Sequence, residues 1–244
     1  MERIPNDSDL ELAEYWAKAA TVSGKAGLKW RAKTKRFTWK FVIGATIALK
    51  RLFDIVVSGS ALIALSPIFA VTAALIKLED KGPVFFIQNR IGLRGRSFQI
   101  WKFRSMVLDA EKVAKRMIEQ QEAKDTVEIK LKGDPRITRI GRFIRKYSVD
   151  ELPQFWNVFK GDMSIVGPRP VVPAEVADYS VEERKRLLAK PGLTCFWQVG
   201  GRTDLDFENQ VRLDIEYIKS SSIWLDIKLL FLTIPAVLLG KGAY

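Results

Sequence analysis

Histidine is absent from this 244-residue chain, and cysteine occurs once, at Cys195. Without histidine there can be no Ser-His-Asp triad, no His-ligated zinc site and no histidine general base. A single cysteine forms neither an intramolecular disulfide nor a multi-cysteine metal site. Any chemistry must therefore use carboxylates, Lys, Arg, Ser, Thr or Tyr, together with an oxygen-preferring metal such as Mg²⁺.

Acidic residues are missing from residues 22–53, which carry nine lysines and arginines interleaved with Trp30, Phe37, Trp39 and Phe41. The net charge of +12 and the pI near 9.8 also indicate an anionic partner. Cations mixed with aromatics suit an anionic membrane surface, and a solvated charged helix is the alternative. We expect a polar, acid-rich tail over residues 1–24, without signal-peptide features, and a basic-aromatic interfacial segment over residues 25–53.

Charge is absent from residues 55–76, and 22 residues make a helix of about 33 Å. Ser66 and Pro67 lie in the middle, where proline breaks or kinks a helix and serine can satisfy a freed backbone group. Both flanks are basic, which argues against a simple span. We favour a re-entrant helix-break-helix hairpin over residues 54–77 rather than a kinked transmembrane helix. Arg51 and Asp54 would pair where the chain meets the membrane.

Residues 78–244 have the pattern of a catalytic α+β domain. Apolar residues flank the turn from Gly92 to Gly95, which predicts a β-hairpin. Residues 107–130 predict a charged helix, and residues 133–148 a Gly-Asp-Pro turn followed by a basic helix. Near the C-terminus, the uncharged run of residues 229–240 is only 12 residues long, which is too short to cross a membrane. It therefore predicts an interfacial or core helix. The expected fold is α+β, mostly helical, and monotopic in the membrane.

Two adjacent acids, Asp150 and Glu151, lie in the stretch SVDELPQ. One interpretation is a capping box, with Ser148 as N-cap and Glu151 three residues later. Pro153 argues against it, because proline would fall inside that helix. A helix that starts at Pro153 places both acids in the turn before an N-terminus, where phosphate is attracted. This second interpretation favours a reaction centre.

Arginines surround the acid pair in the sequence: Arg136, Arg139, Arg142 and Arg145 precede it and Arg169 follows it. Guanidinium groups bind phosphate oxygens bidentately, so a cluster suits a diphosphate, although each arginine alone could serve a surface ion pair. Carboxylates among such cations are expected to stay ionised. One acid could attack phosphorus while its neighbour holds Mg²⁺.

Four long stretches resemble the bacterial sugar transferases, which are monotopic polyprenyl-phosphate phosphoglycosyl transferases. They are KRLFDIVVSGSALIALSPIF, GPVFFIQNRIGLRGRSFQIWKFRSM, DPRITRIGRFIRKYSVDELPQFWNVFKGDMSIVGPRP and KPGLTCFWQVGGRTDLDFENQVRLDIEYI, in family order. The resemblance implies a re-entrant helix broken at Ser66-Pro67. It also implies that Asp150 attacks the β-phosphate of a UDP-sugar and releases UMP. Undecaprenyl phosphate would then take the sugar phosphate from the aspartate.

The resemblance further assigns Mg²⁺ to Glu151. It implies that five cations contact phosphate: Arg145, Arg169, Arg202, Lys102 and Arg104. It places the chain at the cytoplasmic face of the bacterial inner membrane, in the first membrane step of exopolysaccharide or O-antigen synthesis. The expected partners are membrane lipids and the two substrates, with no nucleic acid, and a homo-oligomer is compatible with the apolar surface.

The chain departs from the family pattern at Cys195, where a glycine is expected, and its leader is that of a short form without multiple spans. The ending TIPAVLLGKGAY is similar to that of galactose- or glucose-phosphate transferring members, which indicates a hexose. Two alternatives remain at this stage. One is a magnesium-dependent nuclease or phosphatase that uses the same acids, and the other is a non-catalytic, membrane-anchored basic module.

Overall fold

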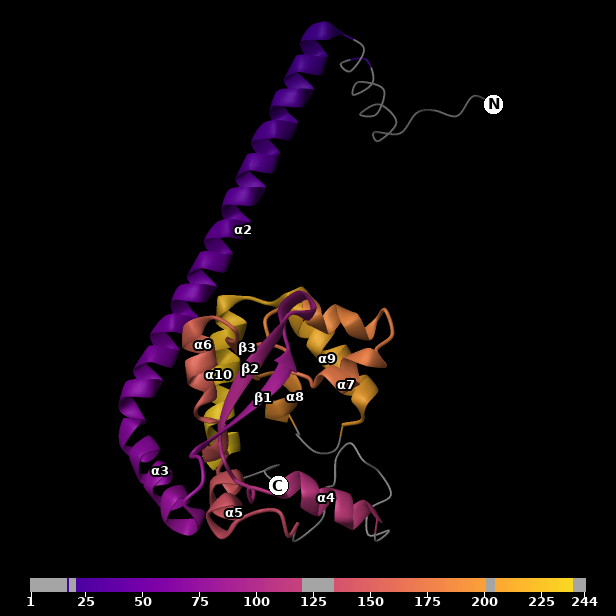
Figure 1. Cartoon of the computed structure of the whole chain (residues 1–244). Helices are drawn as coiled ribbons and strands as arrows, with labels where there is room; N and C mark the ends of the chain where they lie inside the picture. Colours follow the sequence, from indigo (N-terminus) through magenta and orange to yellow (C-terminus); the bar gives the residue numbers. More distant parts are fainter. Residues whose placement is uncertain (1–16, 18–20, 120–133, 201–204, 239–244) are drawn as a thin grey trace. The chain divides into compact units, whose positions relative to one another are not determined.

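The structure, a computed structural model, describes residue 17 and residues 21–119, 134–200 and 205–238, and it separates into two compact units, residues 1–50 and 51–244. The described helices are α2 (Val22–Ala64), α3 (Ser66–Asp80), α4 (Ala110–Glu119), α5 (Arg139–Lys146), α6 (Gln154–Lys160), α7 (Pro173–Ala177), α8 (Phe196–Gly200), α9 (Phe207–Ser220) and α10 (Ile223–Leu238) (Figure 1). The strands are β1 (Phe85–Ile91), β2 (Ser97–Phe103), β3 (Ser164–Val166) and β4 (Gly192–Thr194). The expected α+β, mostly helical class is confirmed.

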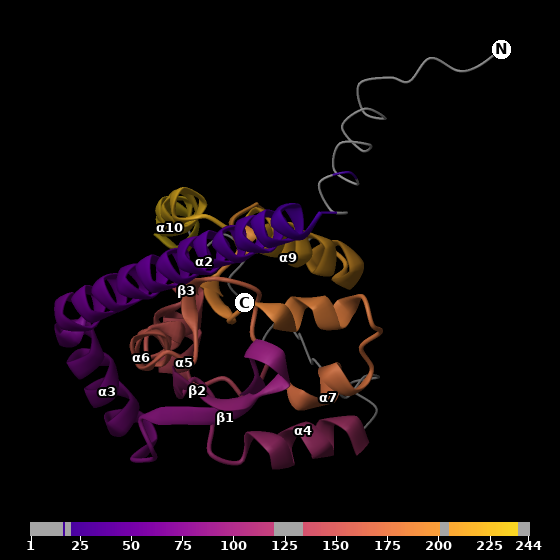
Figure 2. The same cartoon turned by 90° about the horizontal axis from the view of Figure 1, so that it is seen from above.

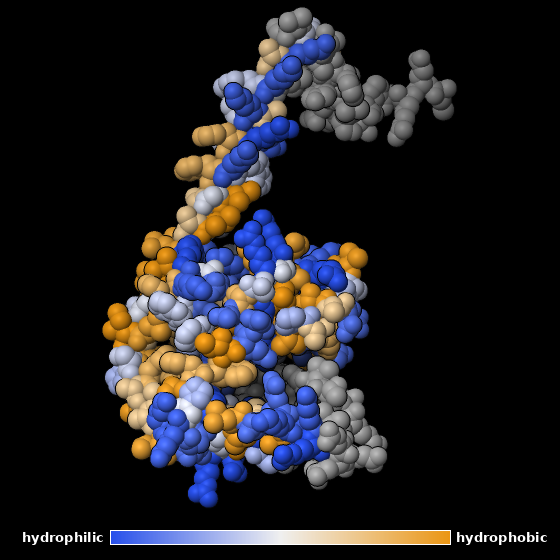
Figure 3. Space-filling view, viewed as in Figure 1, coloured by the Kyte–Doolittle hydropathy of each residue, from blue (hydrophilic) through white to orange (hydrophobic). Residues whose placement is uncertain are grey.

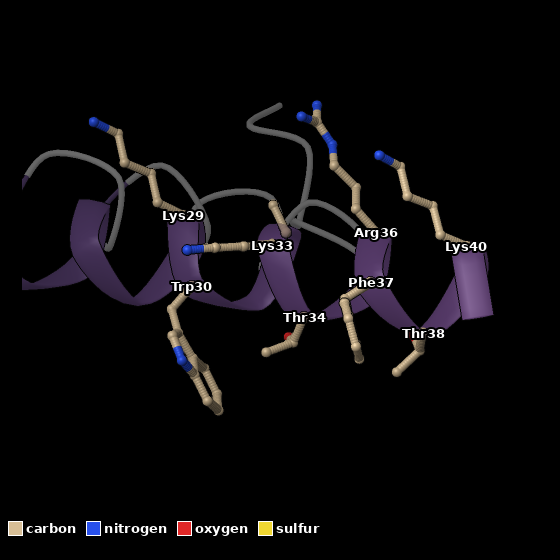
Figure 4. A pocket seen from close by; sticks show the side chains of 9 residues that line it. Lys29, Trp30, Lys33, Thr34, Arg36, Phe37, Thr38 and Lys40 are labelled. Atoms are coloured by element: carbon tan, nitrogen blue, oxygen red, sulfur yellow. The ribbon is translucent and has the colours of Figure 1, made fainter.

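In the first unit, residues 22–50 form the N-terminal part of α2. The hollow drawn in Figure 4 is lined by residues of this one helix, and its side chains divide by chemistry. Lys29, Arg36 and Lys40 point to one side, whereas Trp30 and Phe37 point to the other (Figure 4). These cations and these two aromatic rings therefore lie on different sides of the helix, and contact of the segment with a membrane stays a prediction.

The expected break at Ser66-Pro67 is confirmed: α2 ends at Ala64, α3 begins at Ser66, and the two helices bend by 57°. Pro67 has no N–H to donate to the carbonyl of Ile63, and the Ser66 hydroxyl donates to that carbonyl instead, at 2.8 Å. Within the described ranges, no single helix has the length and apolar character needed to cross a membrane. The bent pair of α2 and α3 meets that test jointly, by length and composition alone.

Two side chains join the C-terminal part of α2 to the rest of the second unit. The Arg51 guanidinium donates to the carbonyls of Val158 and Phe159, at 2.7 and 2.6 Å, and so caps the C-terminal end of α6. The buried Asp54 carboxylate accepts from the Ser164 hydroxyl and from the next backbone N–H, both at 3.0 Å. These contacts hold α2 to α6 and β3. The expected pairing of Arg51 with Asp54 at the membrane stays a prediction.

Strands β1 and β2 form the predicted hairpin, antiparallel with Phe85 opposite Phe103. The hairpin lies between α3 and α7 in both views (Figure 1, Figure 2). Helix α6 lies along the other edge of β2, where the buried Asn157 amide donates to the carbonyl of Gln99 at 2.6 Å and accepts from the N–H of Trp101 at 3.0 Å. Asn157 thus uses both ends of its amide to fix α6 against the strand edge.

Strands β3 and β4 form a second, parallel pair with Ser164 opposite Gly192. A Cβ atom on Gly192 would lie 2.1 Å from the backbone nitrogen of Gly167, so the two segments approach closely because neither glycine carries a side chain. The sequence did not predict this pair, because two three-residue strands are too short for a periodic signal.

Two buried apolar clusters hold the elements around the acid pair. The larger joins β2, α6, β3, α9 and α10, and consists of Ile100, Val158, Met163, Ile165, Val166, Tyr217 and Leu229. The smaller joins α3, β2 and α5 through Ile76, Phe103 and Ile144. Strand β2 belongs to both clusters, so α5 and α6, which flank the acids, pack against the same strand.

Candidate active site

The acid pair lies in a tight turn between α5 and α6. Ser148 has a left-handed backbone (φ 54°, ψ 23°), residues Val149–Glu151 form one 3₁₀ turn, and α6 begins at Gln154. The Ser148 side chain makes no capping bond, so the capping-box interpretation is wrong and the turn before a helix N-terminus is confirmed. A left-handed residue other than glycine costs about 1–3 kcal/mol and occurs preferentially at functional sites.

Lys102 of β2 reaches the acid pair from the neighbouring strand. Its ammonium group lies 2.7 Å from Glu151 Oε1. Residue 102 follows Trp101, whose backbone is bonded to Asn157 of α6, and this attachment places the lysine beside the turn that precedes α6. The structure therefore brings Lys102 of the Lys-Phe-Arg block to the acids.

Asp150 is partly buried, and its pKa is raised to about 6. Burial is the largest cause and the adjacent Glu151 carboxylate the second, while Lys102 and Arg145 act in the opposite direction. Arg145, in the last turn of α5, is thus close enough to act on the carboxylate. The sequence led us to expect that carboxylates among these cations stay ionised. Burial and the second acid outweigh the cations and raise the pKa of Asp150, but a pKa of about 6 does not protonate it at neutral pH. Asp150 is still mostly ionised at pH 7.

Other arginines of the sequence prediction lie elsewhere. Arg104 is buried and forms an ion pair with Asp80 at the end of α3, so its described contacts join α3 to the hairpin. Arg136 pairs with the buried Asp134 at 2.7 Å. Arg202 lies outside the described residues. A phosphate contact for Arg104 or Arg202 stays a prediction.

Arg169 is exposed in the Gly-Pro-Arg-Pro turn that follows β3. Its guanidinium lies over the indole of Trp197 in α8, with the carbon Cζ 5.9 Å from the ring centroid. The indole N–H donates to Asp214 of α9 at 3.2 Å. Sequence reasoning gave no role to Trp197 or Asp214, although both lie in a stretch that resembles the family, because only the packing of α8 on α9 brings the two together.

A magnesium ion at the acid pair stays a prediction, and Oε1 of its expected ligand Glu151 forms an ion pair with Lys102. Across the described part of the chain, no group of three or more His, Cys, Asp or Glu side chains is arranged to hold a metal. Asp150 and Glu151 supply two neighbouring carboxylates, and Mg²⁺ is commonly held by one or two carboxylates together with phosphate oxygens of a substrate. In that prediction, phosphate oxygens of a substrate supply further ligands.

Cys195, where the resemblance led us to expect glycine, is fully buried between β4 and α8. Burial raises the pKa of its thiol well above the usual range. The departure from the pattern thus places a small apolar group in the core and adds no reactive thiol.

Residues 45–240 match the protein family described as "Bacterial sugar transferase". The undecaprenyl-phosphate galactose phosphotransferase of Salmonella typhimurium is 46% identical over 80% of this chain, and the undecaprenyl-phosphate glucose phosphotransferase of Komagataeibacter xylinus is 42% identical over 80%. This chain spans 42% and 37% of the length of those two relatives. The exopolysaccharide production protein ExoY of Sinorhizobium fredii is 41% identical over 80% of this chain and 88% of its own length.

These matches extend from the middle of α2 to the last described helix, and they include the acid pair, the hairpin and the Gly-Pro-Arg-Pro turn. The chain belongs to the bacterial sugar transferase family.

Proposed function

We propose that this protein transfers a sugar 1-phosphate from a UDP-sugar to undecaprenyl phosphate, with Asp150 as the nucleophile. The observation that carries the proposal is the placement of Asp150. It lies in a strained turn before a helix N-terminus, with its pKa near 6, beside Glu151, Lys102 and Arg145. An ionised carboxylate needs no separate base to attack phosphorus, which accords with a chain that lacks histidine.

In the first step, an oxygen of Asp150 attacks the β-phosphorus of the UDP-sugar. The bond between that phosphorus and the oxygen bridging the two phosphates breaks, and UMP leaves with the bridging oxygen. The sugar phosphate remains on Asp150 as an acyl phosphate. In the second step, a phosphate oxygen of undecaprenyl phosphate attacks the same phosphorus, and the bond to Asp150 breaks. The products are the diphosphate-linked lipid sugar and the free carboxylate.

The neighbouring side chains would bind and orient the diphosphate. Arg145 and Lys102 lie near the carboxylate and oppose the charge that accumulates when a phosphate approaches it. Glu151 would hold Mg²⁺, which when bound would neutralise phosphate charge and polarise the phosphorus for attack. Arg169, and Arg202 by resemblance, would contact further phosphate oxygens.

The donor sugar is proposed to be a hexose. The relatives from Salmonella typhimurium and Komagataeibacter xylinus are named for galactose and glucose, and ExoY for exopolysaccharide production. A place in the first membrane step of exopolysaccharide or O-antigen synthesis accords with those names.

The protein is proposed to sit at the cytoplasmic face of the bacterial inner membrane, with residues 54–77 re-entrant. Large apolar side chains are exposed along this stretch, among them Ile63 (79%), Ile68 (44%) and Val71 (60%). Figure 3 shows hydrophobic side chains along this edge of the second unit. An exposed apolar surface of this kind marks a contact with lipid or another apolar partner, and a membrane position would bring the lipid phosphate to the acid pair.

Replacement of the nucleophile tests the reaction. With UDP-galactose or UDP-glucose, Mg²⁺ and undecaprenyl phosphate, we expect the wild-type protein to release UMP. Asp150→Asn should lower that rate by about a thousandfold or more, since the amide cannot attack phosphorus. Asp162→Asn, in the turn after α6, is the matched control and should retain activity. Release of UDP instead of UMP would indicate a hydrolase, and full activity of Asp150→Asn would exclude this residue as nucleophile.

The pH profile of kcat/KM for UMP release should fall about tenfold per pH unit below pH 6, because the raised pKa of Asp150 leaves its carboxyl protonated there. Glu151→Gln removes a charge that raises this pKa, so its acidic limb should move to lower pH. Lys102→Met removes a charge that lowers it, so its limb should move to higher pH. A limb that stays in place in both variants would contradict the assignment of the limb to Asp150.

Cysteine labelling tests the membrane topology. In Lys33→Cys and Arg96→Cys variants, a membrane-impermeant maleimide should label both positions only from the cytoplasmic side, because a re-entrant hairpin returns the chain to its starting face. The buried Cys195 thiol should give no background. Labelling of the two positions from opposite sides would establish a span in place of the hairpin.

A further inference from the structure

An ion pair in the second unit lies entirely away from water. Arg186 and Asp214 are 3% and 0% exposed, and Nε and Nη2 of the arginine lie 2.8 and 2.7 Å from Asp214 Oδ2. The remaining nitrogen of the guanidinium, Nη1, donates to the Tyr179 hydroxyl at 3.0 Å. A buried pair of this kind keeps one geometry because its hydrogen-bonding groups are occupied. Asp214 is therefore a fixed acceptor inside the fold.

The second carboxylate oxygen of Asp214 receives the indole N–H of Trp197. Oδ1 lies 3.2 Å from Nε1, and the Trp197 side chain is 5% exposed. Since Oδ2 is engaged by Arg186, the carboxylate presents Oδ1 to the indole, and this bond fixes the rotation of the ring. A guanidinium group lies over the ring that is held in this way.

That group is the Arg169 guanidinium, whose carbon Cζ is 5.9 Å from the Trp197 ring centroid. The distance is within the range of a cation–π contact. Pro168 and Pro170 restrict the backbone on both sides of the arginine, and the carbonyl of Pro168 accepts from the N–H of Gly192 at 2.8 Å. The turn and the side chain are thus both held, whereas an exposed arginine normally loses much rotamer entropy when it binds a ligand.

We propose that Trp197, held by the Asp214–Arg186 ion pair, is a positioning residue that preorganises Arg169 to bind the diphosphate of the nucleotide sugar. The inference rests on the proposed function, in which Arg169 contacts phosphate. Trp197 itself touches no substrate. It keeps the guanidinium in one place before the substrate arrives, so less freedom is lost on binding.

A double-mutant cycle tests this inference with inorganic pyrophosphate as the probe. Calorimetric binding to the full chain in detergent is compared for the wild type, Arg169→Ala, Trp197→Leu and the double variant. Loss of the aromatic face should weaken binding about threefold to tenfold in Trp197→Leu. The double variant should bind as weakly as Arg169→Ala alone, because Trp197 acts only through Arg169.

Two further variants separate positioning from a general loss of structure. Trp197→Phe keeps a ring beneath the guanidinium but loses the N–H, so it should lose about twofold in affinity, and only when Arg169 is present. Trp224→Leu, on the exposed side of α10, is the matched tryptophan control and should bind as the wild type does. If Trp197→Leu does not fold, the cycle with Trp197→Phe decides. The inference would be overturned if the Trp197 variants bound pyrophosphate with wild-type affinity. It would also be overturned if the fold-loss of affinity in the double variant equalled the product of the two single losses.

UMP release in the same variants separates this inference from the proposed function. If the wild type releases UMP and Arg169→Ala slows it while the Trp197 variants do not, the function stands and the positioning role fails. If neither the wild type nor any variant releases UMP, but the losses in pyrophosphate binding free energy of the two single variants are not additive, the positioning role stands and the proposed function fails. A wild type that does not bind pyrophosphate contradicts the positioning role.

Discussion

The side-chain amide of Asn157 holds the acid pair and Lys102 relative to one another. It donates to one residue of β2 and accepts from another, so α6 cannot slide along the strand without breaking both bonds. The acid pair precedes α6 and Lys102 is the next residue of β2 after Trp101, so the same bonds set the distance between them. Arg51 and Asp54 reinforce this arrangement from α2 by binding the end of α6 and the start of β3. The C-terminal part of α2 and the acid pair are thus parts of one packed unit.

The acid pair combines two opposing requirements of a carboxylate nucleophile. The carboxylate must be ionised, yet a strong ion pair would occupy the oxygen that has to attack. Lys102 forms an ion pair with Glu151 and acts on Asp150 through its charge. Burial and the second acid raise the pKa of Asp150 to about 6, which leaves it mostly ionised at neutral pH. Asp150 is therefore more basic than an ordinary aspartate and is still ionised. A cation bound to the substrate phosphate would attract this carboxylate toward the phosphorus.

Local signals in the sequence predicted the elements near the acids. The Ser66-Pro67 break, the hairpin at Gly92 and the turn before α6 each depend on a proline, a glycine or a short alternation of residues, and all three were found. Contacts between distant segments were not predicted. Asn157 against β2, Gly167 against Gly192, and Asp214 against Arg186 and Trp197 each depend on packing that no short stretch encodes. Arg104 looked like an active-site cation from its motif, but its described ion pair is with Asp80.

The most direct test of the central claim is the mass of the protein after incubation with a UDP-hexose and Mg²⁺ in the absence of undecaprenyl phosphate. Intact-protein mass spectrometry at neutral pH should find one added hexose phosphate, and peptide mapping should place it on Asp150. Addition of undecaprenyl phosphate should remove the adduct, and Asp150→Asn should never carry it. Release of UMP on addition of undecaprenyl phosphate, without any adduct beforehand or with the adduct on another residue, would contradict a covalent Asp150 intermediate.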